Sequence, residues 1–350
     1  MAAAKDGVRA GKSLTGATCI AVSQRLRLCF TLERLNDHLQ AWMELVRSGD
    51  ARALARAISA VENRSPESAA LLKGLFPHSG KARILGLTGP PGAGKSTLVD
   101  QLARHYRRAG QSLGIIAVDP TSPYTGGAIL GDRIRMLDHH ADPGIYIRSM
   151  ATRGSLGGLA RTTADVATVL DASGRNLILI ETVGVGQDEV DIVGLADITV
   201  VILVPGMGDD VQTIKAGIME IADVFVINKS DREGAERVER EIRAMQSLAT
   251  RHDNWIPPIV KTVASEGKGV ENLVAAIANY ESYLHKENLV LKRNIHNWQA
   301  RLVEMLRDAM LERARMELGN GQVERYAAEV AQHKRDPYTL VEEIVRKAGQ

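Results

Sequence analysis

Five short apolar segments, separated by longer helical stretches, constrain the fold of this chain more than any other feature. They are ARILGLT (82–88), LGIIAVD (113–119), NLILIET (176–182), ITVVILV (198–204) and VFVINK (224–229). Each is apolar at successive positions, which is typical of strands that are buried on both faces. Strands that alternate with helices predict a mainly parallel sheet with helices on both sides. The expected fold class is therefore α/β.

Both ends of the chain have a helical pattern instead. Apolar residues share one face in the N-terminal segment, at Leu35, Leu39, Trp42 and Val46. Asp50 is placed to cap a second helix, and Ser65-Pro66 predicts the start of a third, with proline at its first position. Near the C-terminus, a long amphipathic helix is predicted by the spacing of Leu291, Ile295, Trp298, Leu302, Met305 and Ala309. Gly319-Asn320-Gly321 should end it, and a second helical stretch follows.

These patterns divide the chain into four parts. We expect a flexible tail at 1–30, an N-terminal helical segment at 31–78, a nucleotide-binding domain at 79–285 and a C-terminal helical arm at 286–350. The tail is basic and rich in Ala, Gly, Ser and Thr, so it fits either an unstructured end or a transit peptide. The first alternative implies a cytoplasmic protein, and the second implies the mitochondrial matrix.

Composition excludes several classes of protein. Lys and Arg total 44 against 42 for Asp and Glu, and this near balance disfavours nucleic-acid binding through bulk charge. No apolar stretch reaches the length of about 18 residues that crosses a membrane. Cys19 and Cys29 are the only cysteines in the sequence, which rules out a disulfide scaffold or a cysteine-rich zinc site.

A glycine-rich motif follows the first apolar segment. Residues 89–96, GPPGAGKS, fit the pattern G-x-x-x-x-G-K-[ST], in which backbone N–H groups point at phosphate oxygens. We expect Lys95 to reach the β- and γ-phosphates and the Ser96 hydroxyl to bind Mg²⁺. The alternative is a plain turn, but the preceding strand and following helix favour a P-loop NTPase. The predicted nucleotide-binding residues here are Gly89, Pro91, Gly92, Ala93, Gly94, Lys95, Ser96 and Thr97.

A second motif predicts which base is bound. Asn228, Lys229 and Asp231 fit N-K-x-D and follow a late strand. A carboxylate at Asp231 can accept from N1–H and the 2-amino group of guanine, whereas adenine offers neither donor. Asn228 is expected at the base edge, and the Lys229 stem on the ring face. A helix cap at Asp231 is the alternative. Ala264 and Ser265 suit a loop that closes over the base.

Carboxylates cluster where strands end. Asp119 and Glu181 end apolar segments and Asp132 lies in a following loop. Ligands bind open α/β sheets at this edge, so we expect these three, with Ser96, to hold Mg²⁺ directly or through its waters. Solvation or helix capping explains any one of them alone. Gly184, three residues after Glu181, suits close approach to a γ-phosphate.

Two further glycine-rich loops, at 153–158 and 204–210, are candidate mobile switches or plain connections. Lys215 follows the second loop and can swing toward the nucleotide, although a lone helical lysine is more often a solvated charge. We expect Lys95, Asp119, Glu181 and Lys215 to serve catalysis. His139-His140 is read as a surface pair, because no second cluster has metal-ligand spacing.

In this order, GPPGAGKST, VDPTSPYTGGAILGDRIRM, TRGSLGGL, ETVGVGQDE, GDDVQTIKAGIMEIAD and NKSD resemble the MeaB/ArgK family. These are GTPases associated with methylmalonyl-CoA mutase, and the resemblance covers about residues 30–350. It implies a GTP-hydrolysing chaperone of an adenosylcobalamin-dependent acyl-CoA mutase. Such a chaperone gates cofactor loading from a cobalamin adenosyltransferase and protects or reactivates the mutase.

The resemblance also implies residue roles. Asp119 and Asp132 would belong to a first switch, Glu181 to a second, and Asp209 with Lys215 to a third. The C-terminal helices would form a homodimerisation arm. Pro123-Tyr124 departs from the small or polar residues that are usual in the first switch.

Other functions remain possible on the residues alone. A kinase would use the same phosphate loop, but N-K-x-D favours guanine over adenine. A metal-chaperone GTPase usually carries Cys or His clusters, and a binding module would use nucleotide only structurally. No glutamine is clearly placed to orient water, so we expect slow intrinsic GTP hydrolysis that a partner accelerates.

Overall fold

A computed structural model describes residues 37–119, 139, 141–151, 158–182, 194–206, 221–248, 254–319 and 321–348. The strands are β1 (Arg83–Thr88), β2 (Leu113–Asp119), β3 (Ile145–Ala151), β4 (Leu177–Glu181), β5 (Ile198–Leu203), β6 (Val224–Asn228) and β7 (Ile259–Thr262). The helices are one at 37–47, α2 (Ala51–Glu62), α3 (Ser68–Leu75), α4 (Lys95–Arg108), α6 (Gly158–Ala172), α10 (Ala235–Leu248), α11 (Val270–Lys286), α12 (Leu289–Leu318), α13 (Gln322–Ala331) and α14 (Pro337–Ala348).

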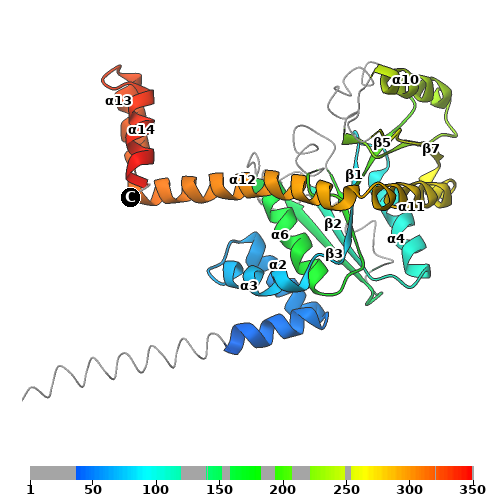
Figure 1. Ribbon diagram of the computed structural model, residues 1–350, viewed down its shortest axis with the longest axis horizontal. Helices are drawn as coiled ribbons and strands as arrows, with labels where there is room; N and C mark the ends of the chain where they lie inside the picture. The colour runs from blue at the N-terminus through cyan, green and yellow to red at the C-terminus, as the bar shows by residue number, and fades with distance from the viewer. Residues whose placement is uncertain are drawn as a thin grey trace, which may run out of the picture.

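The seven strands form one parallel sheet in the order β3-β2-β4-β1-β5-β6-β7. This confirms the expected α/β class with a parallel sheet between helices and with helices at both ends (Figure 1). All five predicted apolar segments are strands. None of the predicted segments corresponds to β3 or β7, which lie at the two edges of the sheet.

Alternate strand residues face opposite helical layers. In β4, Leu177 and Leu179 pack in the core under α4 and α11, whereas Ile178 and Ile180 face α2, α3 and α6. A third cluster joins β5 and β6 to α10. Each fully buried Leu or Ile contributes about 1.5–3 kcal/mol of hydrophobic stabilisation, which explains the continuous apolar runs. Because every strand is parallel, their carboxyl ends share one edge, where the nucleotide motifs lie.

The N-terminal helices belong to this core. Trp42, Val46, Leu54 and Ile58 are buried with residues of β2, β4 and α6. The Asp50 carboxylate accepts from the N–H of Ala53 at 2.7 Å, so the predicted cap of α2 is confirmed.

The predicted start of the third helix is wrong by two residues. Helix α3 begins at Ser68, after a turn over Pro66 and Glu67. It has no side-chain cap; the backbone carbonyl of Ser65 instead accepts from the N–H and hydroxyl of Ser68. Proline therefore precedes the helix within a turn, a position that it also favours.

The long C-terminal helix is present as predicted. Helix α12 ends at Leu318, and Gly319 follows at φ +65°, in the left-handed region that favours glycine. It runs from α11 past α6 and projects beyond the sheet, with α13 and α14 at its far end (Figure 1). Helix α14 packs against α12. Among the described residues, no helix combines the length and the apolar character needed to span a membrane.

Candidate nucleotide-binding site

The loop between β1 and α4 has a backbone that requires glycine at two positions. Gly89 has φ +147°, and a Cβ there would lie 2.1 Å from the carbonyl oxygen of Ile202. Gly94 has φ +86°, and a Cβ there would lie 2.4 Å from Nδ2 of Asn228. No real Cβ tolerates such contacts, so the motif glycines allow this loop to lie against β5 and the end of β6.

Lys95 is the first residue of α4, and its side chain turns back over the loop. Its Nζ donates to the carbonyl oxygens of Gly89 at 2.8 Å and Pro90 at 3.1 Å. The side chain is buried, so the ammonium is held beside the loop backbone. A positive charge beside a helix N-terminus favours an anion at this point.

Ser96 and Glu181 meet across the sheet edge. The Ser96 hydroxyl donates to Oε1 of Glu181 at 2.6 Å, and both residues are buried. Register explains the meeting, because Glu181 pairs with Leu87 of β1, just before the loop. A hydroxyl and a carboxylate are both hard oxygen donors, the type that Mg²⁺ prefers.

For Asp119 the structure describes the backbone alone. Asp119 is the last residue of β2, beside β4, so its backbone lies at the same edge as Glu181. Its side chain is outside the described part of the structure, as are Asp132, Gly184 and Lys215. Within the described residues, no group of three or more His, Cys, Asp or Glu side chains is arranged to hold a metal ion.

Asn228, the last residue of β6, contacts the phosphate loop and the segment at the end of β7. Its Nδ2 donates to the carbonyl oxygen of Ala93 at 2.8 Å. Its Oδ1 accepts from the N–H of Ala264 at 3.0 Å and from the Thr262 hydroxyl at 3.1 Å. These bonds show that this buried amide joins the phosphate loop to the loop after β7.

Lys229 and Asp231 follow on the same loop. Lys229 has φ +54°, unusual for a residue with a side chain, and its Nζ donates to the carbonyl of Gly92 at 2.8 Å. Strained backbone of this kind gathers at functional sites. Asp231 and Ser265 are exposed, whereas Ala264 is buried. The exposed Asp231 carboxylate is therefore accessible to a ligand.

Two threonine contacts at the site carry no recognisable sequence motif. Thr182, directly after Glu181, donates its hydroxyl to that of Thr88 at 3.0 Å, and both are buried. Thr262 orients the Asn228 amide, as described above. A threonine at a strand end is too common to be singled out from sequence, so only the fold identifies these contacts.

The interpretation of His139 as a surface residue is wrong. His139 is buried, and its Nε2 lies 2.7 Å from Oδ1 of Asp100 on α4. Asp100 also binds Arg104 one turn later. A carboxylate on α4 thus satisfies the imidazole within the chain, which a sequence reading of the isolated pair could not reveal.

Comparisons with known proteins agree with this geometry. A family model described as methylmalonyl Co-A mutase-associated GTPase MeaB matches residues 54–318. A protein of Pyrococcus abyssi named as a GTPase is 46% identical over 308 residues, covering 87% of this chain and 95% of its own. The GTPase ArgK of Escherichia coli is 37% identical over 247 residues, covering 68% and 75% respectively.

A solved structure shows the same architecture. The crystal structure of a LAO/AO transport system kinase superposes with a TM-score of 0.66 at 25% identity, covering 89% of this chain and 98% of that one. The resemblance seen in the motifs is thus confirmed by the family model and by both relatives. The chain belongs to the MeaB family and is a P-loop GTPase that binds guanine nucleotide.

Proposed function

We propose that the protein is a GTP-hydrolysing chaperone of an adenosylcobalamin-dependent acyl-CoA mutase of the methylmalonyl-CoA mutase type. The observation that carries the proposal is the extent of the family match. It runs from α2 to the end of α12, and so includes the helices on both sides of the nucleotide-binding sheet. The family description names association with methylmalonyl Co-A mutase, which supports a mutase as the partner.

Mg²⁺ fits the residues at the edge of the sheet. The Ser96 hydroxyl and the Glu181 carboxylate, 2.6 Å apart, offer adjacent oxygen ligands beside the phosphate loop. Asp119, at the neighbouring strand end, and Asp132 complete the proposed set. When bound, the ion would neutralise charge on the phosphates. The residues that we assign to catalysis are Lys95, Asp119, Glu181 and Lys215.

The phosphate loop and the Asn228 contacts together support the proposed guanine site. Loop N–H groups bind phosphate oxygens, and Lys95 exchanges its contacts with Gly89 and Pro90 for the β- and γ-phosphates. Asp231 accepts from guanine, and the Lys229 stem covers the ring. Ala264 and Ser265 close over the base, and Gly184 senses the γ-phosphate. The Asn228 amide connects the phosphate loop, at Ala93, to the loop that contains Ala264.

Hydrolysis by the isolated protein should be slow. Lys95 and Lys215 offset negative charge on the phosphates, and Asp119 and Glu181 would act through Mg²⁺ when it is bound, but no described side chain is placed to orient the attacking water. We propose that the mutase completes the site and accelerates turnover, as partner proteins do for other GTPases. The nucleotide state then controls cofactor loading from an adenosyltransferase and the protection or reactivation of the mutase.

The exposed apolar face of α12 supports a homodimer. Large apolar side chains are exposed beyond Trp298, at Leu302, Val303, Leu306, Met310 and Leu311. Several large apolar side chains exposed along one helix are typical of an interaction surface. We therefore propose that residues 286–350 form a dimerisation arm. The second proposed boundary, at 78, separates the N-terminal helical segment from the nucleotide-binding domain. We also propose a cytoplasmic protein without nucleic-acid or membrane partners.

A protection assay tests the chaperone role. A candidate adenosylcobalamin-dependent mutase is allowed to turn over until it loses activity, with this protein and GTP, with this protein and GDP, or alone. We expect the mutase to retain activity longer with the protein and GTP than alone. Equal inactivation in all three reactions, with GTP hydrolysis intact, would reject the chaperone role while leaving the GTPase assignment in place.

A further inference from the structure

Strands β1 and β4 run side by side and end at the nucleotide loop. Leu87 of β1 pairs with Glu181 of β4, and the N–H of Thr182 donates to the carbonyl oxygen of Leu87 at 3.1 Å. The parallel pairing thus continues by one residue and places Thr182 beside Thr88, the last residue of β1. The Thr182 hydroxyl donates to the Thr88 hydroxyl at 3.0 Å. Gly89, the first residue of the phosphate loop, follows Thr88 directly.

The two hydroxyls lie on the opposite face of the sheet from the contact between Ser96 and Glu181. Side chains alternate along a strand, and Leu179 of β4 packs under α4, whereas Ile180 packs against α2, α3 and α6. Glu181 therefore faces α4, where it meets Ser96, and Thr182 faces the other helical layer. The end of β4 is thus tied to the two ends of the phosphate loop by one hydroxyl contact on each face of the sheet.

Burial makes the contact between the two threonines strong in its effect on geometry. Thr88 is 1% exposed and Thr182 is 2% exposed, so water cannot replace a partner that is lost. Thr199 of the neighbouring strand β5 is also buried, but its hydroxyl has no hydrogen-bond partner among the described residues. Burial of a threonine in this sheet therefore does not by itself produce such a pair.

We propose that Thr182 is a positioning residue for GTP hydrolysis, which acts through Thr88 to hold the Glu181 carboxylate at the phosphate loop. A group that serves catalysis must be held within about 0.5 Å of its productive position, and small displacements lower the rate. Nucleotide binding depends less on this contact, because Lys95 and the loop N–H groups bind the phosphates. The inference rests on the role of Glu181 proposed above and does not depend on a mutase.

Basal hydrolysis of GTP by the full chain tests the proposal without a partner protein. Thr182→Val keeps nearly the same shape and removes the hydroxyl. We expect kcat to fall about fivefold, the rate equivalent of one neutral hydrogen bond, while KM and GDP affinity keep their wild-type values. Thr182→Ser retains a hydroxyl and should restore most of kcat.

Further variants test the pair and the role of Glu181 separately. Thr88→Val should lower kcat as much as Thr182→Val, and the double variant should lower it no further, because the same contact is lost in all three. The double variant leaves no unpaired hydroxyl buried, so it provides the test if a single variant is unstable. Glu181→Gln should lower kcat more than any of them. Wild-type kcat in Glu181→Gln would reject the proposed role of Glu181, whereas a loss in Glu181→Gln alone would reject only the role of the threonine pair.

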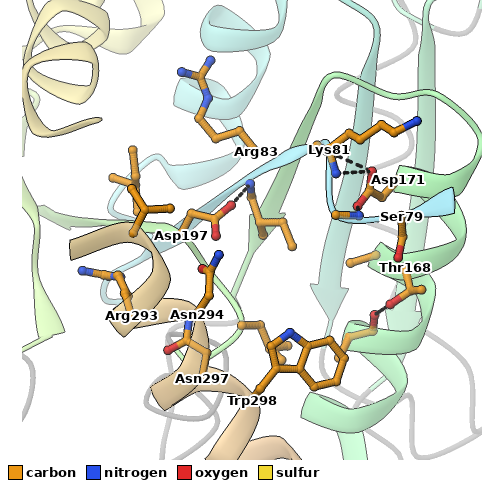
Figure 2. A pocket seen from close by; sticks show the side chains of 18 of the residues that line it. Ser79, Lys81, Arg83, Thr168, Asp171, Asp197, Arg293, Asn294, Asn297 and Trp298 are labelled. Carbon is orange, nitrogen blue, oxygen red and sulfur yellow. Dashed lines mark hydrogen bonds between the residues drawn. The ribbon is translucent and has the colours of Figure 1, made fainter. Parts of the chain in front are cut away.

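Two threonines away from the contact provide matched controls. Thr199→Val removes a buried hydroxyl from β5. Thr168→Val removes a hydroxyl that donates to the carbonyl oxygen of Ala164 within α6 at 2.9 Å, beside a cavity near the edge where the strands begin (Figure 2). Both controls should keep the wild-type kcat. An equal loss of kcat in the controls, a loss of GDP affinity without a loss of kcat in Thr182→Val, or a kcat of Thr182→Ser as low as that of Thr182→Val would each overturn the proposal.

Discussion

Asn228 shows how single hydrogen bonds position the nucleotide site. Its amide contacts Ala93 in the phosphate loop and Ala264 beyond β7, so segments about 170 residues apart in sequence are held by one buried side chain. The contact depends on the absence of a side chain at position 94. Substitution of Gly94 therefore tests this contact directly.

Gly94→Ala should disrupt both the loop and nucleotide binding. The added Cβ would lie 2.4 Å from Asn228 Nδ2, in addition to about 1 kcal/mol of strain from the positive φ. The matched control is Gly110→Ala, because Gly110 has φ +78° but nothing within 4 Å of the new Cβ. We expect GDP affinity to fall at least tenfold in Gly94→Ala only. Equal GDP affinities in the two variants would remove the steric argument.

Asp197→Asn should stabilise the fold in a pH-dependent way. Burial raises the pKa of Asp197 above its value in the unfolded chain, so this acid favours folding at low pH and loses that contribution as pH rises through the folded-state pKa. The melting temperature of the variant should therefore exceed that of the wild type at neutral pH. The difference should vanish below about pH 4, the ordinary range of aspartic acid. A constant difference across pH would refute this assignment.

At the scale of elements, strand β6 connects the nucleotide site with the root of α12. Asn228 ends the strand, while Asp223 directly precedes it. The buried Asp223 carboxylate accepts from Arg293 of α12 at 2.6 and 3.1 Å and from the N–H of Thr199 at 2.9 Å. The start of the long helix is thus fixed to the strand that leads into Lys229 and Asp231.

Arg293→Met should destabilise the protein by about 3 kcal/mol, because the buried carboxylate of Asp223 loses its guanidinium partner. Arg325→Met is the control, since it removes an exposed pair with Glu329 one turn away on α13, worth at most about 0.5 kcal/mol. Urea unfolding at neutral pH measures both. A similar small loss in the two variants would show that the Asp223 pair does not anchor α12.

Sequence patterns predicted the central elements better than the edges. The five apolar runs and the α12 periodicity are long, uniform signals, and each was found as the expected element. Strand β7 has only four residues and β3 is partly exposed, so neither has a continuous apolar run. A first helical position is predicted for Pro66, but this residue lies in a turn, which proline also favours.

Sequence patterns likewise predicted only part of the nucleotide-binding site. The glycine-lysine-serine motif identifies Lys95 and Ser96 through residue type and spacing. The Thr88–Thr182 contact and the burial of His139 arise from register and packing between distant segments, which a single sequence does not encode locally. Roles for Asp132, Gly184 and Lys215 stay predictions, since these residues lie outside the described ranges.

At the scale of the whole molecule, the projecting α12 dominates the shape (Figure 1). Near its start, Trp298 contacts Phe76, whereas Leu291 and Ile295 are exposed. Beyond Trp298, further large apolar side chains are exposed. A test of dimerisation therefore belongs beyond Trp298, where substitution does not disturb contacts with Phe76.

Leu306→Glu should convert a dimer into monomers. Leu306 is 61% exposed, so a charge there costs little in the monomer but is unfavourable within an apolar interface. Light scattering across a concentration series should give half the mass of the wild type. Lys292→Glu, an exposed change near the root of the same helix, should keep the wild-type mass. Equal masses for Leu306→Glu and wild type would dispose of this interface.

The most direct test of the central claim is turnover of GTP by the purified protein, measured with and without a candidate adenosylcobalamin-dependent mutase and with ATP as control. We predict slow GTP hydrolysis alone, clear acceleration by the mutase, and no turnover of ATP. Acceleration would link the nucleotide site to the mutase that the family description names. GTP hydrolysis that no such mutase accelerates, or ATP turnover at a comparable rate, would contradict the account.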